Sequence, residues 1–149
     1  MLLNNETLLL LKKKTESQGY IELPAEGNSM YPFIQNGNIC HFDFIEPKHI
    51  KKGDIILFHS EVGKLVAHRF HRMEMKNGHL FYILKGDSNL GYDAPVMEQQ
   101  IIGRMASIQR NNKQIKVTDY GVKLWTSLVL SWPLISGVLR MYLNRKYQN

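Results

Sequence analysis

A serine in a constrained turn is the first feature of this 149-residue chain that could do chemistry. Ser29 lies within residues 27–32 (GNSMYP), behind a glycine and ahead of a proline. Such a turn lets a hydroxyl project from the chain, where a neighbouring base can make it a nucleophile. Most serines in this setting only satisfy a turn, so a catalytic role requires a base from elsewhere in the chain.

A histidine on an alternating strand pattern is the candidate base. In residues 65–72 (LVAHRFHR), alternation places His68 on the more apolar face, between Val66 and Phe70. Burial there disfavours the imidazolium and would keep the ring neutral near pH 7, as a general base requires. The alternative is a core histidine bonded to a carbonyl group.

Two carboxylates in a polar loop complete the set. Asp87 and Asp93 lie six positions apart in residues 85–93 (KGDSNLGYD), which follow an apolar run. Carboxylates in a loop rich in glycine and asparagine usually cap turns. They could instead orient a histidine or help to build a site that contains a serine.

Other reactive side chains have plainer interpretations. Lys64 shares the face of His68 but lies at the turn end of the strand, so it ranks below His68 as a base. His71 should lie on the opposite face as a solvated residue, and Cys40 should be a buried, inert thiol. The remaining histidines lack metal-ligand spacing, so we expect no metal and no other cofactor.

Short extended runs, separated by turns, must position these groups. The predicted strands are residues 20–23, 39–45, 54–58, 65–73, 79–84, 101–108 and 114–118. Asn-Gly pairs at 36–37 and 77–78 are strong hairpin signals, because both turn positions tolerate positive φ. Closely spaced strands without intervening helices predict a mainly β fold, a compact antiparallel barrel or bent sandwich.

A helix is expected at each end of the β region. Residues 4–17 predict a short amphipathic helix, capped by Asn5 and stopped by Gly19. Its apolar run at 8–11 is too short for a secretory signal and has its lysines on the wrong side. The predicted organisation is therefore an N-terminal helix at 1–19, a β domain at 20–120 and a C-terminal apolar helix at 121–149.

The C-terminal segment has a composition typical of an interfacial helix. Residues 124–139 carry no charge but include Pro133 and Gly137, and sixteen residues fall short of the roughly 20 that span a bilayer. On one helix they would share a face, flanked by basic residues, that suits a membrane interface. Packing on the protein's own core and a true span are the alternatives. The face comprises Trp125, Leu128, Trp132, Ile135, Leu139 and Tyr142, and its flanks are Lys123, Arg140, Arg145 and Lys146.

Charge and cysteine content narrow the function classes. Residues 1–103 hold 11 basic and 12 acidic side chains, whereas residues 104–149 hold 8 basic and 1 acidic, so the excess positive charge lies in the last third. This basic region lacks the aromatic interleaving of a nucleic-acid module, and we expect no nucleic-acid partner. One cysteine excludes an internal disulfide framework, and ordinary charged and apolar fractions exclude a disordered chain.

Taken in order, the segments resemble one family. The order is a Ser-Met-x-Pro turn at 29–32, a GDIILF strand at 53–58, a His-Arg pair at 68–69 and a KGDSN loop at 85–89 with a later aspartate. This order is similar to that of the type I signal peptidases, which are serine endopeptidases. It resembles the branch of the endoplasmic reticulum, archaea and some Gram-positive bacteria, in which histidine replaces lysine as the base.

The resemblance implies a role for each candidate residue. Ser29 would be the nucleophile and its backbone N–H an oxyanion donor, His68 the general base, and Asp93 the carboxylate that orients the imidazole. Asp87 would be an alternative third member or a structural anchor of the loop. Met30, Tyr31 and Pro32 would line the substrate groove.

Two departures from the family pattern affect the site. The family often has a serine two places before the nucleophile, where this chain has Gly27, so Asn28 is our candidate for the missing oxyanion donor. The Gly-Asp pair that usually follows the turn is Gly37-Asn38 here. Members of the family also carry an N-terminal membrane anchor, which we do not expect at the start of this sequence. We therefore expect the C-terminal segment to attach the protein to a membrane, and a cytoplasmic location is the alternative.

The resemblance therefore predicts a serine endopeptidase that forms an acyl-enzyme and cleaves a leader or signal segment of a precursor protein after small residues. The alternative is a vestigial membrane-surface adaptor on the same fold. Self-cleaving repressors share the β fold and the serine turn, but use a lysine base and carry an N-terminal DNA-binding domain, for which the first 25 residues are too few.

Overall fold

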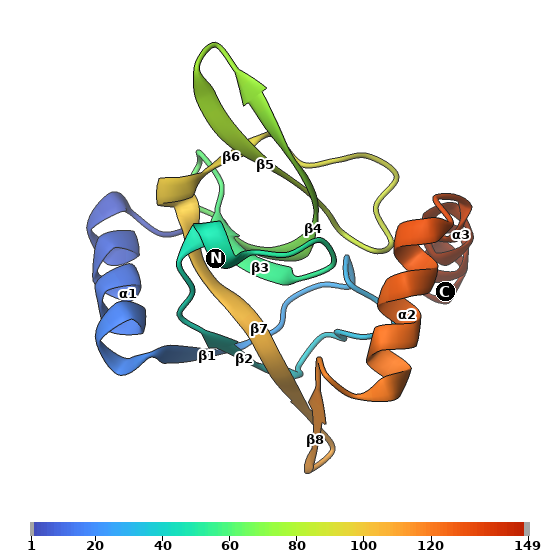
Figure 1. Cartoon of the computed structure of the whole chain (residues 1–149). Helices are drawn as coiled ribbons and strands as arrows, with labels where there is room; N and C mark the ends of the chain where they lie inside the picture. The colour runs from blue at the N-terminus through green and yellow to red at the C-terminus, as the bar shows by residue number, and fades with distance from the viewer. Residues whose placement is uncertain (1, 148–149) are drawn as a thin grey trace.

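An antiparallel sheet organises the chain in this computed structural model, which describes residues 2–147 (Figure 1). The strand order is β1-β2-β7-β3-β4-β5-β6, and β8 pairs with β7. The strands are β1 Tyr20–Pro24, β2 Ile39–Asp43, β3 Ile55–His59, β4 Leu65–Lys76, β5 His79–Lys85, β6 Val96–Met97, β7 Ile101–Arg110 and β8 Lys113–Lys116. Within residues 2–147 no pairing joins β1 to β6, so the sheet is open. The mainly β prediction is confirmed, and a closed barrel is not.

The seven predicted strands are present, with shifted ends. The hairpin of β4 and β5 continues to Lys76, three residues beyond the prediction, because Asn77 and Gly78 form its turn with φ of 50° and 77°. No sequence signal marked β6, which is two residues long and follows the 85–93 loop. Two short 3₁₀ helices, η1 Pro47–His49 and η2 Glu98–Gln100, precede β3 and β7.

The central strand β3 is apolar on both faces and separates two groups of buried side chains. Ile55 and Leu57 point into one group, and Ile56 and Phe58 into the other. An uninterrupted apolar run is what a strand covered on both sides requires. The first group also contains Met30, Phe33, Ile34, Cys40, Phe42, Ile102, Met105, Ile108 and Val122, and the second Ile45, Ile50, Phe70, Tyr82, Leu84, Val96 and Ile101.

The N-terminal helix α1, Asn5–Gln18, begins one residue away from the expected cap. Asn4, not Asn5, is the N-cap, because its Oδ1 accepts a hydrogen bond of 2.8 Å from the Thr7 N–H. At the other end Gly19 has φ of 81°, and its N–H donates to the Thr15 carbonyl. Gly19 therefore ends the helix as predicted.

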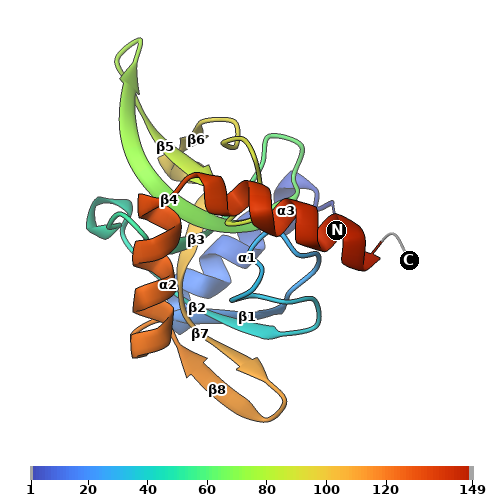
Figure 2. The ribbon, with the colours of Figure 1, turned by 90° about the vertical axis from the view of Figure 1, so that its right-hand side faces the viewer.

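The C-terminal segment forms two helices where one was predicted. They are α2 Tyr120–Ser131 and α3 Leu134–Tyr147, and the chain bends by 108° between them (Figure 2). Pro133 lies at the break, where its ring and missing N–H end a helix. The predicted single face through Trp125, Trp132 and Tyr142 is therefore wrong. Of the predicted end segments 1–19 and 121–149, residue 1 and residues 148–149 lie outside the described residues.

The two C-terminal helices are only partly packed on the protein. Val122 and Val129 of α2 are buried, and Trp125 packs against the first core group. Other apolar side chains of the pair are exposed, namely Tyr120, Leu124, Leu128, Trp132, Leu134, Val138, Met141, Tyr142 and Tyr147. No single helix within residues 2–147 is long and apolar enough to cross a membrane, although the bent pair together satisfies the length and composition of a span.

Candidate active site

The turn that carries Ser29 follows the end of β1. Gly27 adopts φ of 81°, a left-handed conformation that favours glycine, which accounts for the absence of a serine side chain at this position. The chain then winds tightly around Ser29: the Tyr31 N–H donates to the Asn28 carbonyl at 3.1 Å, and the Ile34 N–H to the Met30 carbonyl at 3.0 Å. The Tyr31–Pro32 peptide bond within this turn is cis.

Asn38, at the position where the resembled family has an aspartate, contacts the same turn. Its buried Oδ1 accepts a hydrogen bond from the Gln35 N–H at 3.0 Å and from the Arg110 guanidinium at 3.2 Å and 3.3 Å. Arg110 also donates to the carbonyls of Pro32 and Phe33. The amide oxygen of Asn38 thus serves as the hydrogen-bond acceptor in this turn, so the turn does not lack an acceptor although the carboxylate is absent.

His68 lies in β4 opposite Ile56 of β3, and only 6% of its surface is exposed. Its ring meets Phe58 edge-on, with 6.3 Å between the ring centroids. The alternation of β4 sends the next residue, Arg69, to the other face of the sheet, as the sequence pattern predicts.

Ser29, His68 and Asp93 come together although 39 and 25 residues separate them from each other along the chain. His68 Nε2 is 2.9 Å from Ser29 Oγ, and His68 Nδ1 is 2.6 Å from Asp93 Oδ2. An ionised carboxylate only accepts hydrogen bonds, so Nδ1 donates to Asp93 and Nε2 is left to accept the Ser29 hydroxyl proton. This tautomer and these distances are those that proton abstraction from a serine requires.

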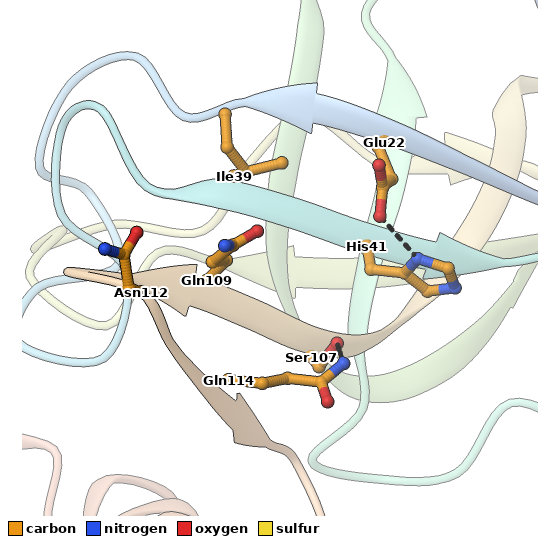
Figure 3. Close-up of a pocket in the computed structure, with 7 residues that line it drawn as sticks. All are labelled: Glu22, Ile39, His41, Ser107, Gln109, Asn112 and Gln114. Atoms are coloured by element: carbon orange, nitrogen blue, oxygen red, sulfur yellow. Dashed lines mark hydrogen bonds and ion pairs between the residues drawn. The ribbon is translucent and has the colours of Figure 1, made fainter.

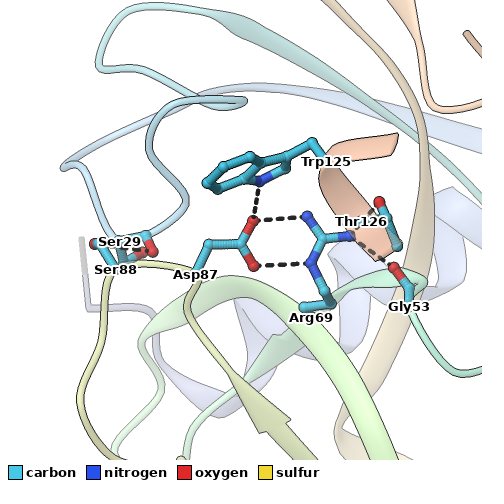
Figure 4. A network of polar contacts seen from close by, with 7 residues as sticks. All are labelled: Ser29, Gly53, Arg69, Asp87, Ser88, Trp125 and Thr126. Carbon is cyan, nitrogen blue, oxygen red and sulfur yellow. Dashed lines mark hydrogen bonds and ion pairs between the residues drawn. The ribbon is translucent and has the colours of Figure 1, made fainter. Parts of the chain in front are cut away.

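Asp87 lies away from the imidazole, in a buried network with Arg69 (Figure 4). Arg69 Nε and Nη2 donate to the two Asp87 oxygens at 2.8 Å and 2.6 Å, and the indole N–H of Trp125 donates to Oδ2 at 2.9 Å. Arg69 Nη1 donates to the Gly53 carbonyl and the Thr126 hydroxyl, each at 2.9 Å. Of the two roles predicted for Asp87, this geometry corresponds to the anchor.

Ser88 is a site residue that the sequence reasoning missed. It is 1% exposed, its N–H donates to the Ser29 carbonyl at 2.9 Å, and its hydroxyl contacts the carbonyls of Asn28 and Ser29 at 2.9 Å and 3.1 Å. Gly86 lies equally close, because a Cβ there would be 2.8 Å from the Ser29 carbonyl oxygen. The signal was the run of small residues beside Asp87, which lets two backbones approach.

A groove of about 540 Å³ opens in front of the serine and the histidine. Met30 lines it as predicted, but Tyr31 and Pro32 do not. The Tyr31 ring instead stacks on Tyr142 of α3 at 5.7 Å, with the Lys146 ammonium 5.7 Å from its centroid. The lining comprises Leu23, Pro24, Ala25, Glu26, Gly27, Ser29, Met30, Ile34, Cys40, Phe42, Leu57, Lys64, Leu65, Val66, Ala67, His68, Asn89 and Asp93.

Two strand edges flank this groove. β1 is the first strand of the sheet order, and Leu23 and Pro24 contribute its end to the lining. β4 pairs with β5 only from Arg69 onward, so among the described residues 65–68 pair with β3 alone. Both edges therefore have backbone groups available to an extended chain in the groove.

The candidate oxyanion donors are the backbone N–H of Ser29 and the side chain of Asn28. Among the hydrogen bonds of residues 2–147, none uses the Ser29 N–H as donor. Asn28 Oδ1 is buried and has no hydrogen-bond partner in the same part of the chain. The side-chain amide of Asn28 is therefore not fixed through its oxygen.

The other reactive residues fall into three environments. Burial raises the pKa of the Cys40 thiol from 9.0 to about 12, which agrees with an inert thiol. Lys64 lines the groove at the start of β4. The prediction of a solvated His71 is wrong, because the side chain is half-buried. The pairing of β4 with β5 shifts at this residue, and its ring meets Tyr92 edge-on, with 5.3 Å between the ring centroids. Burial and the Lys85 ammonium lower the pKa of His71 from 6.5 to about 4.

A second, smaller pocket lies apart from these residues (Figure 3). It has a volume of about 260 Å³, and its His41 ring lies between Glu22 and Asp43 at 3.1 Å and 3.2 Å. His41 alternates with Cys40 and Phe42, which line the large groove, so the two pockets lie on opposite faces of β2. Its lining comprises Glu22, Ile39, His41, Ser107, Gln109, Asn112 and Gln114.

Comparison with known proteins agrees with the expected family. The chain is 28% identical over 93 residues to Signal peptidase I W of Bacillus subtilis (strain 168). The alignment covers 61% of this chain and 49% of the relative, so the chain spans about half the length of that protein. No protein-family model matches the chain. The similarity supports a relationship with the signal peptidases. It does not distinguish a histidine base from a lysine base, so that part stays a prediction.

Proposed function

We propose that this protein is a serine endopeptidase of the signal-peptidase type, in which Ser29, His68 and Asp93 form the catalytic triad. The observation that carries the proposal is the pair of contacts at one imidazole, 2.9 Å to the Ser29 hydroxyl and 2.6 Å to the Asp93 carboxylate. The similarity to a named signal peptidase supports the reaction class.

The reaction follows from the tautomer of His68. Nε2 accepts the Ser29 proton as Oγ attacks the carbonyl carbon of the scissile peptide, and Asp93 stabilises the imidazolium that forms. His68 then donates this proton to the leaving amine, which departs and leaves an acyl-enzyme on Ser29. Water, deprotonated by the same imidazole, hydrolyses the ester and restores the serine.

The negative charge on the carbonyl oxygen requires preorganised donors. We assign the first to the Ser29 backbone N–H, which no carbonyl of the described chain engages. We assign the second to the side-chain amide of Asn28, because its Oδ1 has no hydrogen-bond partner within residues 2–147. The loss of one such donor typically costs about 3–4 kcal/mol of transition-state stabilisation.

The substrate is an extended leader or signal segment of a precursor protein. The two strand edges beside the groove suit a peptide that binds by strand addition, with backbone hydrogen bonds to β1 and β4. The family preference for small residues at the cleavage site is the basis for proposing the same preference here. Met30 and Ile34 supply apolar surface to the groove.

A membrane surface is the proposed second partner. The bent pair of α2 and α3 exposes large apolar side chains, with Trp132 65% and Leu134 82% exposed at the elbow. The excess positive charge of the chain lies in its last third, and an anionic lipid surface complements it. Attachment through this pair would bring the groove to a precursor whose leader lies at the lipid.

Single substitutions at the nucleophile and the base test the proposal. We expect Ser29→Ala and His68→Ala each to lower precursor cleavage at least about 1,000-fold, because the members of a triad act as a unit. Ser17→Ala and His79→Ala are the matched controls, since both residues are exposed and lie outside the groove. Undiminished processing by both site variants would refute the assignment.

A fluorophosphonate probe separates this function from a vestigial adaptor. The probe phosphonylates an activated serine with loss of fluoride, so we expect one adduct on Ser29 in the wild-type protein and none in Ser29→Ala. A wild-type protein that binds vesicles but forms no adduct would instead favour the adaptor.

A further inference from the structure

A tryptophan of the C-terminal helix pair reaches the loop beside the nucleophile. The Trp125 indole N–H donates to Asp87 Oδ2 at 2.9 Å, across 38 residues of sequence (Figure 4). The next residue of α2, Thr126, accepts a hydrogen bond from Arg69 at 2.9 Å. One turn of α2 thus contacts both members of the buried ion pair.

The ion pair needs these contacts because it is almost completely inaccessible to water. The side chains of Arg69 and Asp87 are each 1% exposed. A buried carboxylate or guanidinium that loses a hydrogen-bond partner has no water to replace it, so its desolvation is less well compensated, and a shift of the surrounding backbone would relieve this cost.

Each member of the pair is joined directly to a residue of the site. Arg69 follows His68 in β4, and Asp87 precedes Ser88, which binds the Ser29 carbonyl. A shift of the ion pair is therefore transmitted to the base through one peptide unit, and to the nucleophile through one peptide unit and the Ser88 hydrogen bond. The distance at stake is the 2.9 Å between His68 Nε2 and Ser29 Oγ.

We infer that Trp125 is a positioning residue, whose indole N–H holds the 85–93 loop so that Ser29 stays within reach of His68. The inference rests on the proposed function, because its effect is on acylation of Ser29. On this inference α2 helps to position the proposed catalytic residues, and it also packs against the core.

Packing is the competing explanation, since the Trp125 ring also contacts the first core group. Trp125→Phe separates the two roles, because it retains an aromatic ring and removes the N–H donor. Thr126→Val serves the same purpose at Arg69: it removes the hydroxyl acceptor and retains the branched shape that packs against Gly53. Tyr20→Phe is the matched control, because it removes a polar group from an exposed aromatic ring that lies outside the groove and outside the helix pair.

The experiment measures the rate at which the fluorophosphonate labels Ser29, kcat and KM for a precursor peptide, and thermal unfolding, on the full chain. We expect Trp125→Phe to slow labelling by about 10- to 100-fold and to lower kcat by a similar factor, with KM within about twofold, because misplaced reacting groups affect the chemical step. Tyr20→Phe should match the wild type. The chain has two tryptophans, so Trp132→Phe isolates the Trp125 emission, which should be blue-shifted relative to that of Trp132 in Trp125→Phe.

The outcomes separate the two proposals. A wild-type protein whose Ser29 takes no label overturns the proposed function. A wild-type protein that labels, together with a folded Trp125→Phe that labels equally fast, overturns the positioning role alone. If Trp125→Phe does not fold, a folded Thr126→Val decides: labelling of Ser29 at the wild-type rate overturns the inference, and slower labelling with an unchanged KM supports it.

Discussion

Two aspartates six positions apart have different environments, and strand parity explains why. His68 and Arg69 are neighbours in β4 and point to opposite faces, so one loop must provide a carboxylate to each face. Asp93, with a partly exposed side chain, pairs with the imidazole, and buried Asp87 pairs with the guanidinium. The guanidinium has several donors to satisfy, which accounts for the two-point contact with Asp87.

His71 provides a prediction about acid stability. Its pKa is about 4 in the folded protein and about 6.5 when unfolded, because burial disfavours the charged ring. The unfolded chain therefore binds more protons between these values, and stability falls as pH decreases from about 6.5 toward 4. We expect His71→Gln to lose about 1 kcal/mol less than the wild type between pH 7 and pH 5, a figure reduced for the partly exposed ring.

Urea unfolding at the two pH values measures this difference. His49→Gln is the control, because His49 is exposed. An equal loss of stability in His71→Gln and the wild type would show that another group causes the acid sensitivity.

At the scale of the element, the 85–93 loop positions the site through its smallest residues. Gly86 has no room for a side chain, whereas a methyl group at Gly91 in the same loop would meet nothing within 4 Å. The sequence marked this loop by its carboxylates. It could not mark the close approach to Ser29, which depends on packing between segments more than 50 residues apart.

Alanine at each of these two glycines forms a matched pair. We expect Gly86→Ala to lower the rate at which Ser29 is labelled by about 100-fold, because its Cβ would be 2.8 Å from the Ser29 carbonyl oxygen and would displace the turn. Gly91→Ala should stay within about twofold of the wild type. Labelling by the fluorophosphonate probe measures both, and equal rates in the two variants would contradict the proposed contact.

The strands and the helix ends differ in how well the sequence predicted them. Alternation and Asn-Gly turns are local, so the strands and the hairpin of β4 and β5 were predictable. The first helix was predicted, but its cap was displaced by one residue, because Asn4 and Asn5 are both suitable caps. At the C-terminus the uninterrupted apolar run favoured a single helix, and the break at Pro133 was not predicted. Composition indicates apolar character, but it does not indicate where the chain changes direction.

At the scale of the whole molecule, we propose that two different parts of one helix pair serve catalysis and attachment. Trp125 of α2 faces the ion pair behind the site, whereas the elbow around Trp132 faces outward. The three residues of the proposed triad were predictable because their types and order match a known pattern. The role of α2 was not, because nothing in the sequence around Trp125 indicates a partner 38 residues away.

Vesicle binding tests the proposed attachment. We expect the protein to sediment with phosphatidylglycerol vesicles at low salt and to be released at high salt, because each basic residue near the surface contributes about 1 kcal/mol and is screened. Leu134→Glu should abolish binding, since it puts a charge on the most exposed part of the elbow. Val62→Glu, at a similarly exposed position between β3 and β4, is the control. Binding that survives Leu134→Glu would place the contact elsewhere.

The clamp of Arg110 on the serine turn has a consequence for newly made protein. Arg110 is synthesised 77 residues after Phe33, whose carbonyl it binds, which corresponds to several seconds of translation. Until the ribosome has released β7, the turn has neither the guanidinium nor the neighbouring strand that shape it. A nascent chain therefore carries the Ser29 hydroxyl in an unformed turn, and the peptidase activity that we propose would arise only late in biosynthesis.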